Sequence, residues 1–473
     1  MKCVSLEHGL QAFHNFINNV RYKFIIMSYD NRDSIDFAKS DIPQLFRSIF
    51  IPTLLGMLFN VAFTLTDGIF VGNGVGPQGL ASVNLVAPIM MIMTGLGVMF
   101  GIGSSVVAAI HLSQENKKAA RINVTQAFLA GGVLASLLGI VLYLFSRNVL
   151  VLLGVTPELM NMVHEYYVWF IPTCLFLMFQ IIGEFVIRLD GSPRYAMYAN
   201  IIPAVVNIVL DYLFIFPCGM GLKGAALATD IGAGVGALMA FYYMVFRAEN
   251  LRFYRLKCSW TSLRLTLRNV GYMIKLGLSG FVGDLAISVM MLTGNIVFGR
   301  YLGEEGIAAY SVICYLFPMV YMVYSAVATS AQPIISFNYG AGENERVRHT
   351  FRHSVVVSLI FGAVMTMLFC FLPRTIIGIF LHPGVASFGY AVQGLPLYAL
   401  GFVFVAFNIS AIGYYQSTEQ AGFSTLLMLL RGMVLLVPAF LLLPLWLGES
   451  GLWLAVPLAE VVTSVVAFIR IRK

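Results

Sequence analysis

The fold is decided by the stretch Ile51–Gly72, which reads IPTLLGMLFNVAFTLTDGIFVG. It is long and apolar enough to cross a bilayer, since about 20 apolar residues span one as a helix. Yet it contains Asp67, and it has Pro52 near its start. An aspartate at the centre of a spanning helix costs roughly 2.5–3.5 kcal/mol on insertion scales. Asp67 is therefore expected to have a function that offsets this cost.

The whole chain has the composition of a membrane protein. Of its 473 residues, 59% are hydrophobic and only 11% are charged, whereas a soluble domain has roughly 25% charged residues. The net charge of +7 then reflects basic cytoplasmic loops rather than binding to nucleic acid. The 6 cysteines are far apart and have no histidine at ligand spacing, so neither a disulfide nor a metal site is predicted.

Twelve spans are predicted, which makes the chain an all-α polytopic membrane protein. Their approximate limits are 46–72, 82–112, 121–146, 160–189, 194–216, 222–247, 268–298, 306–332, 349–373, 387–415, 419–444 and 450–471. Basic residues concentrate after the second, fourth, sixth and eighth spans and at the C-terminus. We therefore expect a multi-pass protein of the cytoplasmic (inner) membrane with both termini in the cytoplasm.

The two halves of the chain are copies of one unit. A pattern in the turn after the first span recurs after the seventh at an offset of 227, so that Gly72, Gly76, Gly79 and Ala81 correspond to Gly299, Gly303, Gly306 and Ala308. Six spans per half give a parallel repeat about an axis along the membrane normal. Such a repeat predicts two six-helix bundles with a binding site between them.

The predicted organisation has four parts. A cytoplasmic tail covers 1–44, a first lobe 45–248, a basic linker 249–268 and a second lobe 269–473. Met27 offers a second start, and 1–26 would then be an extension without function. Within the linker, residues 251–268 mix Leu, Phe, Tyr and Trp with Arg and Lys. They are interpreted as a basic amphipathic helix on the inner leaflet.

Polar residues in three spans of the first half share one depth. Asp67, Asp211 and Thr229 lie close to the outer ends of their spans, and Asn207 precedes Asp211 by one turn on the same face. Two carboxylates held together in a low dielectric cannot both stay ionised cheaply, so the group is typical of a proton site. The same oxygens could coordinate Na⁺. The alternative is that each side chain packs separately and the shared depth is chance; Asp230 either joins the group or faces the second bundle.

Three further charged residues lie near mid-membrane in the second half. They are Asp284, Arg431 and Glu460. An arginine at that depth needs an acid. A structural ion cluster is favoured here over a role in transport.

The chain resembles the multidrug and toxic compound extrusion (MATE) family of secondary transporters from about Pro43 to its end. The similar segments are IPTLLG and TDGIFVG in the first span, VVNIVLDYLFIF in the fifth, GLKGAALAT in the sixth and the glycine pattern of both outer turns. The resemblance implies two six-helix lobes arranged in a V. It also implies export of organic, often cationic, compounds in exchange for H⁺ or Na⁺.

The resemblance further implies roles for individual residues. Asp67 is similar to the first-lobe aspartate of the DinF-like branch, whose partners on helices five and six correspond to Asn207, Asp211 and Thr229. Pro52 corresponds to a proline at which the first helix bends. Phe63 departs from the branch, in which a tyrosine is expected one turn before the acid. The other main branch has acids on spans seven and ten, but span ten has none here and Asp284 is not clearly at the matching place.

These observations predict a cation-coupled multidrug efflux antiporter and not an enzyme, because no nucleophile or His–Asp pair at one depth is visible. The alternative is a lipid-linked precursor flippase of the same superfamily, which should carry more cationic residues between its lobes. We expect a monomer whose partners are small organic substrates and the lipid bilayer. No cofactor is predicted apart from the coupling ion, H⁺ or Na⁺.

Overall fold

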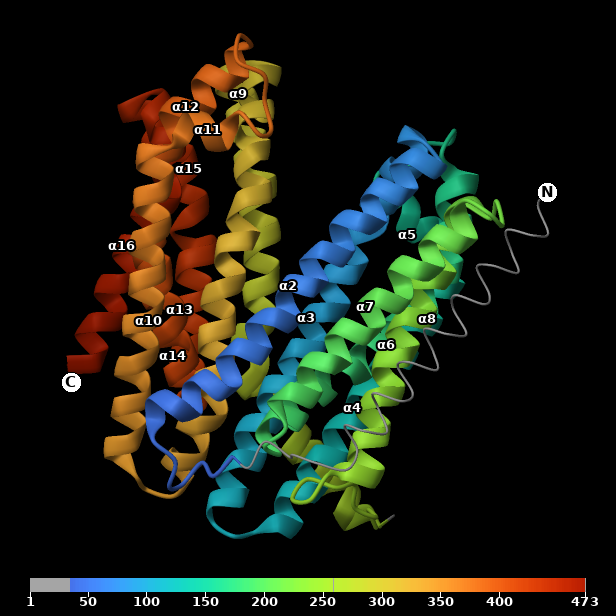
Figure 1. Cartoon of the computed structure of the whole chain (residues 1–473), viewed down its shortest axis with the longest axis vertical. Coiled ribbons are helices and arrows are strands. Elements are labelled where there is room, and N and C mark those ends of the chain that lie inside the picture. The colour runs from blue at the N-terminus through green and yellow to red at the C-terminus, as the bar shows by residue number, and fades with distance from the viewer. Residues whose placement is uncertain (1–34, 258, 473) are drawn as a thin grey trace.

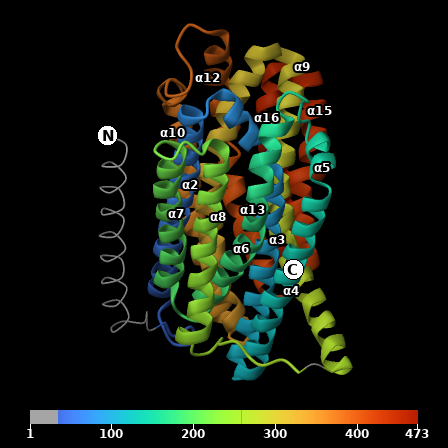
Figure 2. The same ribbon diagram turned by 90° about the vertical axis from the view of Figure 1, so that its right-hand side faces the viewer.

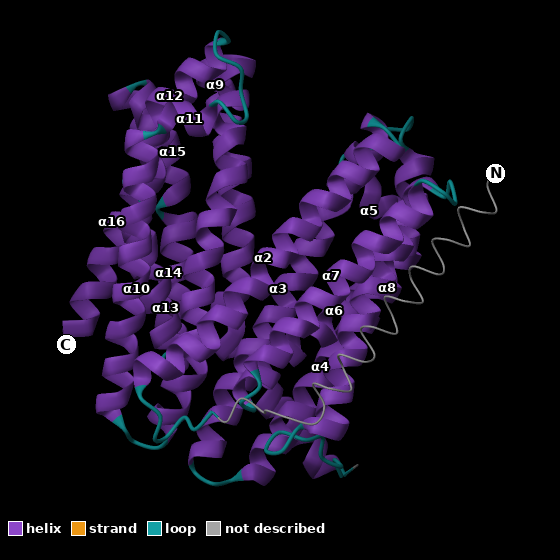
Figure 3. Cartoon of the chain, in the orientation of Figure 1, coloured by secondary structure: helices purple, strands orange, loops and turns teal. Residues whose placement is uncertain are grey.

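Helices that run between two loop-bearing ends form almost the whole structure (Figure 3). The computed structural model describes residues 35–257 and 259–472. Most of the predicted tail, including the extension 1–26, lies outside the described residues. The turns at 35–41 are the part of that tail that the structure describes.

The first lobe contains the helices of the first repeat. They are α2 (Ile42–Gly74), α3 (Pro77–Ser113), α4 (Lys117–Leu144), the short α5 (Ser146–Leu152), α6 (Met160–Leu189), α7 (Pro193–Ile215), α8 (Gly221–Tyr242) and the π-helical turn η1 (Tyr243–Arg247). Helices α2, α3 and α7 carry a proline in their first two positions, where the missing N–H is not needed. These prolines therefore mark where the three spans begin.

The second lobe repeats this arrangement with more interruptions. It contains α9 (Trp260–Gly340), α10 (Asn344–Phe371), α11 (Pro373–Ile377), α12 (Ala386–Ala399), α13 (Phe402–Ser417), α14 (Ala421–Leu429), the π-helical turn η2 (Leu430–Val434), α15 (Leu436–Leu447) and α16 (Glu449–Arg472). Helix α9 holds two spans, because Gly303 breaks it with φ 63° and ψ −153°, a conformation that glycine adopts readily. Helices α12 and α13 form one span bent by 45°.

The count of spans matches the twelve predicted. Ten helices of the described chain are long and apolar enough to cross a membrane, and the bent pair adds an eleventh. Dividing α9 at Gly303 gives the twelfth.

The two lobes form a V (Figure 1). They meet at one end and diverge towards the other, and Figure 2 shows the same bundle from the side. The end at which they meet carries the turns at 114–116 and 341–343 and the segment 248–257. The loops with most of the basic residues therefore lie at the closed end of the V.

Close backbone contact between α3 and α9 holds the lobes together at this end. Gly103 packs against the backbone of Met273, and Gly277 packs against the carbonyl group of Met99. A side chain at either glycine would separate the two helices. Nearby, the side chains of Ser105 and Gln332 form a hydrogen bond of 3.3 Å, and they are 227 positions apart. Equivalent positions of the repeat therefore meet between the lobes.

Helix α2 belongs to both lobes. Its first two turns bury Ile42, Phe46 and Ile49 in a cluster with Val327 and Ile334 of α9. Farther along, α2 packs against α7 in the first lobe. It thus runs obliquely from the foot of the second lobe to the open end of the first (Figure 1).

The segment that precedes α2 is anchored to the second lobe as well. The guanidinium of Arg346 donates to the carbonyl oxygens of Phe37 at 3.1 Å and Ser40 at 2.8 Å. Asn338 donates to the same Phe37 oxygen at 3.2 Å. The start of α2 is therefore fixed on α9 and α10.

The linker differs from its prediction. A helix over 251–268 is wrong in its first part, because 251–257 are not helical and α9 begins only at Trp260. Instead, Leu251 is fully buried, and the ring of Phe253 packs edge-on against Phe128 of α4 at 5.1 Å. The Tyr254 N–H donates to Thr125 Oγ1 at 2.9 Å. The ring of Phe253 and the backbone of Tyr254 thus hold this part of the linker on α4 in place of an amphipathic helix.

Replacing Gly277 by alanine is expected to lower the thermal unfolding midpoint of the detergent-solubilised protein. Its Cβ would collide with the backbone of Met99, and such overpacking costs about 1–3 kcal/mol. Gly271→Ala is the control on the same helix, because no atom lies within 4 Å of the Cβ position there. That variant should be neutral or gain about 0.5–1 kcal/mol from helix propensity. Equal midpoints for the two variants would contradict the close approach of α3 and α9.

Candidate functional site

Three helices of the first lobe bring the sequence-predicted polar residues together. Asp67 comes from α2, Asn207 and Asp211 from α7, and Thr229 from α8. Asp211 is fully buried and Asn207 is 2% exposed, whereas Asp67 and Thr229 are half-buried. Gly232 permits this convergence, because a Cβ there would lie 3.0 Å from Asn207 Cβ.

Asp67 and Asp211 form the centre of this group. The carboxyl group of Asp67 is in direct contact with the carboxyl group of Asp211. A hydrogen bond between two carboxyl groups requires that one of them carries a proton. Asp67 Oδ1 and both carboxylate oxygens of Asp211 are buried and have no hydrogen-bond donor among the described residues. The pair is therefore complete only with a proton or another cation.

The amide and hydroxyl complete the polar surroundings. Asn207 Nδ2 donates to Thr229 Oγ1 at 3.3 Å, and Thr229 Oγ1 donates to the Ala225 carbonyl oxygen at 3.0 Å. This orientation leaves Asn207 Oδ1 buried and without a donor in the described chain. Four buried oxygens of the cluster, on Asp67, Asn207 and Asp211, thus remain as acceptors without a donor. That donor set suits a cation and does not suit an anion.

Helix α6 adds two residues that the sequence reasoning missed. Thr173 Oγ1 donates to Asp230 Oδ1 in a buried contact, so Asp230 faces α6 inside the first lobe and not the second bundle. Tyr166, only 5% exposed, interacts electrostatically with Asp67, Asp211 and Asp230. Its position near the start of α6 matches the depth of the other three helices. The sequence already shows this depth, so Tyr166 of span four could have been predicted as a member of the polar group.

Two residues named from the family resemblance lie on α2 itself. Phe63 lies one turn before Asp67 and brings no hydroxyl group to the carboxylates. Tyr166 brings a hydroxyl group from α6 instead. Pro52 lies inside α2 and is buried, and a proline there cannot donate the helical hydrogen bond to the residue four earlier. The helix is therefore weakened between its second-lobe foot and its acid.

The charges of the second lobe separate into a pair and a single acid. Arg431 Nη2 donates to Glu460 Oε1 at 2.5 Å, and Arg431 Nε donates to Glu460 Oε2 at 3.2 Å. Asn408 Nδ2 also donates to Glu460 Oε2, at 2.7 Å, and Ser464 Oγ donates to Asn408 Oδ1 at 3.0 Å. This fully bonded network is typical of a structural ion pair.

Asp284 is not part of that network. Its carboxylate is half-buried and lies beside Gly95 of α3, between the lobes, at 3.5 Å from the position that a Cβ would take. Tyr321 lies within electrostatic range of both Asp284 and the Arg431–Glu460 pair. No described side chain forms an ion pair or hydrogen bond with the Asp284 carboxylate. Asp284 is therefore a single negative charge on α9 where it faces the first lobe.

The first-lobe group has the oxygen acceptors that a small cation would need. No group of three His, Cys, Asp or Glu side chains in the described chain is placed to hold a metal ion. The two carboxylates could share a proton. With both ionised, Asp67, Asp211, Asn207 and Thr229 offer oxygens that could surround Na⁺.

Breaking the Arg431–Glu460 pair is expected to destabilise the second lobe strongly. Glu460→Leu leaves the buried guanidinium without its acid, at a cost of about 3–5 kcal/mol. The double variant Arg431→Met with Glu460→Leu should recover most of that loss, since it buries no charge. The measurement is the thermal unfolding midpoint in detergent. Asp284→Asn is the control and should change stability by less than about 0.5 kcal/mol; a double variant no better than the single one would contradict a structural pair.

Comparison with known proteins places this architecture in a family. The MatE family model matches residues 52–213 and 281–441, so it covers both repeats separately. Multidrug export protein MepA of Staphylococcus saprophyticus is 24% identical over 441 residues, which cover 92% of this chain and 94% of that protein. A FAD transporter of Shewanella oneidensis is 22% identical over 450 residues, covering 92% and 96%.

Solved structures agree in fold. One described as the outward-facing conformation of a multidrug resistance MATE family transporter superposes with a TM-score of 0.83 at 22% identity, covering 92% of this chain and 96% of that one. Its likeness shows the V-shaped architecture. Because the family model matches most of the chain and the structure carries the spans it requires, the chain belongs to the MatE family of multi-pass membrane transporters.

Proposed function

We propose that the chain is a cation-coupled multidrug efflux antiporter. The observation that supports this best is the group of buried oxygens without donors around Asp67 and Asp211. Such a group binds a proton or Na⁺ and lies in one lobe only. A relative named as a multidrug exporter supports export of several organic compounds as the task to which this cation is coupled.

The proposed cycle alternates the access of a substrate site between the lobes. A substrate binds there from the cytoplasm or the inner leaflet, and the lobes rock until the site faces outward. A cation from outside then reaches Asp67 and Asp211 and removes their repulsion. Helix α2 rearranges near Pro52 and displaces the substrate. Coupling requires that cation and substrate prefer different states of the protein.

The single charge of Asp284 supports a cationic or amphipathic substrate. An unpaired carboxylate between the lobes attracts an organic cation and repels an anion. The relative named as a FAD transporter therefore does not lead us to propose an anionic substrate here. The flippase alternative gains no support, because the charge between the lobes at this level is acidic.

We further propose the membrane placement. The closed end of the V, with the basic turns, faces the cytoplasm, since basic loops remain on that side. Both termini then lie in the cytoplasm and the V opens outward. The protein would work as a monomer in the cytoplasmic membrane, with the coupling ion, H⁺ or Na⁺, as its only cofactor.

Asp67→Asn is expected to abolish export of a fluorescent cationic dye from cells while dye binding to the purified protein is retained. The amide keeps the size of the side chain but can neither take up a proton nor coordinate Na⁺ as a charged ligand. Asp41→Asn is the matched control, because Asp41 is exposed at the start of the same helix and makes no side-chain cap hydrogen bond. Full export by Asp67→Asn would overturn first-lobe coupling.

The coupling ion can be identified by measuring dye transport in vesicles in which the pH and Na⁺ gradients are imposed separately. We expect one of the two gradients to drive dye transport, and Asp211→Asn to remove that response. A Na⁺ gradient that drives transport at constant pH identifies Na⁺, and a pH gradient without Na⁺ identifies H⁺. Dye movement under neither gradient would contradict antiport and favour the flippase.

A further inference from the structure

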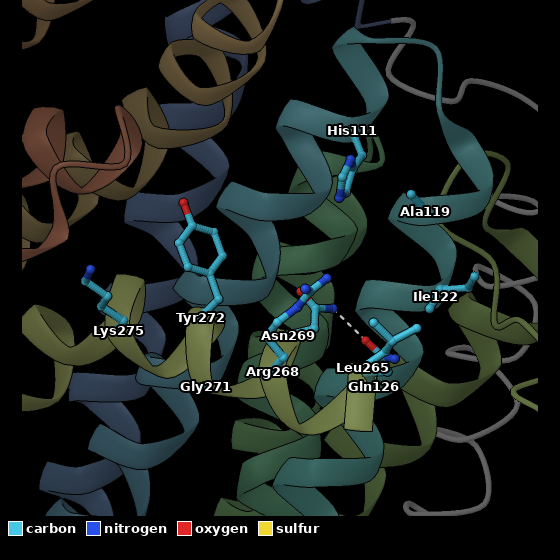
Figure 4. Close-up of a pocket in the computed structure, with 10 residues that line it drawn as sticks. All are labelled: His111, Ala119, Ile122, Gln126, Leu265, Arg268, Asn269, Gly271, Tyr272 and Lys275. Atoms are coloured by element: carbon cyan, nitrogen blue, oxygen red, sulfur yellow. Dashed lines mark hydrogen bonds between the residues drawn. The ribbon is translucent and has the colours of Figure 1, made fainter. Parts of the chain in front are cut away.

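A second candidate site lies at the closed end of the V, far from the carboxylate group. It is a cavity of about 730 Å³ between α3, α4 and the first turns of α9, shown in Figure 4. Arg268, Tyr272 and Lys275 line it from one face of α9, since they are spaced by three and four residues. His111 lines it from the end of α3 and Gln126 from α4.

The cavity carries positive charge without matching acids in its wall. Arg268 and Lys275 are exposed, and neither forms an ion pair with a described residue. His111 Nδ1 is buried and has no hydrogen-bond partner in the described chain. One carboxylate lies close by, since Glu419 accepts a hydrogen bond from Tyr272 Oη at 2.7 Å and lies within electrostatic range of His111. Arg268 and Lys275 thus have no acidic partner among the described residues, and the nearby Glu419 is already bonded to Tyr272. The cavity is therefore suited to an anion.

The beginning of α9 sets this cavity at the level of lipid headgroups. Trp260, Leu263 and Leu267 are 82%, 50% and 65% exposed, although they stand in the same part of α9 as the basic residues. An exposed tryptophan with leucines and arginines is typical of a helix at the membrane interface. Apolar surface for acyl chains and cations for a headgroup therefore adjoin one another.

We propose that this cavity binds the phosphate of an anionic phospholipid. Arg268 would hold the phosphate oxygens with its planar guanidinium, and Lys275 would add a second positive charge. Basic pockets between spanning helices on the basic side of a membrane protein are suited to such headgroups. The acyl chains would lie along Leu263 and Leu267.

The bound lipid would stabilise the closed end of the V. Across the same cavity, Gln126 of α4 in the first lobe bonds to α9 of the second. Its Nε2 donates to Thr266 Oγ1 at 2.8 Å, and its Oε1 accepts from Asn269 Nδ2 at 2.5 Å. A lipid held between α4 and α9 binds only while these helices stay together. It therefore shifts the population towards the state described here.

The test is native mass spectrometry of the full-length protein in neutral detergent. Dioleoylphosphatidylglycerol is titrated against dioleoylphosphatidylcholine, which has the same acyl chains and no net charge. We expect the anionic lipid to bind at least about tenfold more tightly to the wild type. The double variant Arg268→Gln with Lys275→Gln should lose that preference.

The matched control is Lys257→Gln with Arg264→Gln. It removes the same charges from exposed positions of the same segment that do not line the cavity, and it should keep the preference. An equal loss in both double variants would overturn the site, because the attraction would then be diffuse. Matching thermal midpoints for the three proteins exclude misfolding as the cause.

A further arm separates the lipid from a soluble phosphate. Inorganic phosphate is titrated into the wild type, and thermal stability is followed. We expect no stabilisation, since the proposed ligand needs its acyl chains. Stabilisation by inorganic phosphate, together with equal binding of the two lipids, would overturn the lipid and assign the cavity to a soluble phosphate compound.

Discussion

The contact between the Asp67 and Asp211 carboxyl groups is the constraint on which the first lobe depends. Buried acceptors without donors are costly, and this lobe holds several of them around two acids. Under the proposed function, a bound cation would remove that cost, so that the energy of the lobe would change when the ion arrives. Tyr166 and Thr173 lie in the same polar region. A side chain that only filled space could not respond to an ion in this way.

Helix α2 makes this local event matter for the whole molecule. One end of it carries Asp67 among the first-lobe helices, while its first turns are embedded in the second lobe beside Val327 and Ile334. Pro52 lies between the two parts. A shift of Asp67 relative to α7 therefore acts on both lobes through one helix. The polar group also involves α6, α7 and α8, but among the described residues none of these helices has its first turns embedded in the second lobe as α2 does.

Much of the fold follows from the sequence because spans and repeats depend on local composition. The twelve spans come from apolar length, the two copies from the repeated glycine pattern, and the grouping of Asp67 with Asn207, Asp211 and Thr229 from depth. Depth does not say which way a helix faces, so the orientation of Asp230 towards Thr173 required the packed helices. The same limit applies to Asp284. It lies at the depth of the Arg431–Glu460 pair but forms a bond with neither of those side chains.

Other features could not be predicted because tertiary contacts override local pattern. The residues of the linker mix apolar and basic side chains, yet the burial of Leu251 and the packing of Phe253 on Phe128 keep 251–257 out of a helix. Asymmetry between the lobes combines a difference in the sequence with a tertiary contact. The position equivalent to Asp67 is Gly294, and the ring of Tyr310 packs directly on it. An aromatic ring thus occupies the place where the first lobe has its acid.

The contact between the start of α2 and the second lobe also determines the order in which the lobes can fold during synthesis. The Phe37 carbonyl oxygen pairs with Asn338, which is made 301 residues later. At about 5–20 residues per second, the ribosome needs roughly 15–60 s to cover that distance. For most of this interval the apolar first turns of α2 have none of their final neighbours from α9 and α10, since Val327 and Ile334 are made only near its end. Completion of the first lobe must therefore wait for the middle of the second, although its other helices have long emerged.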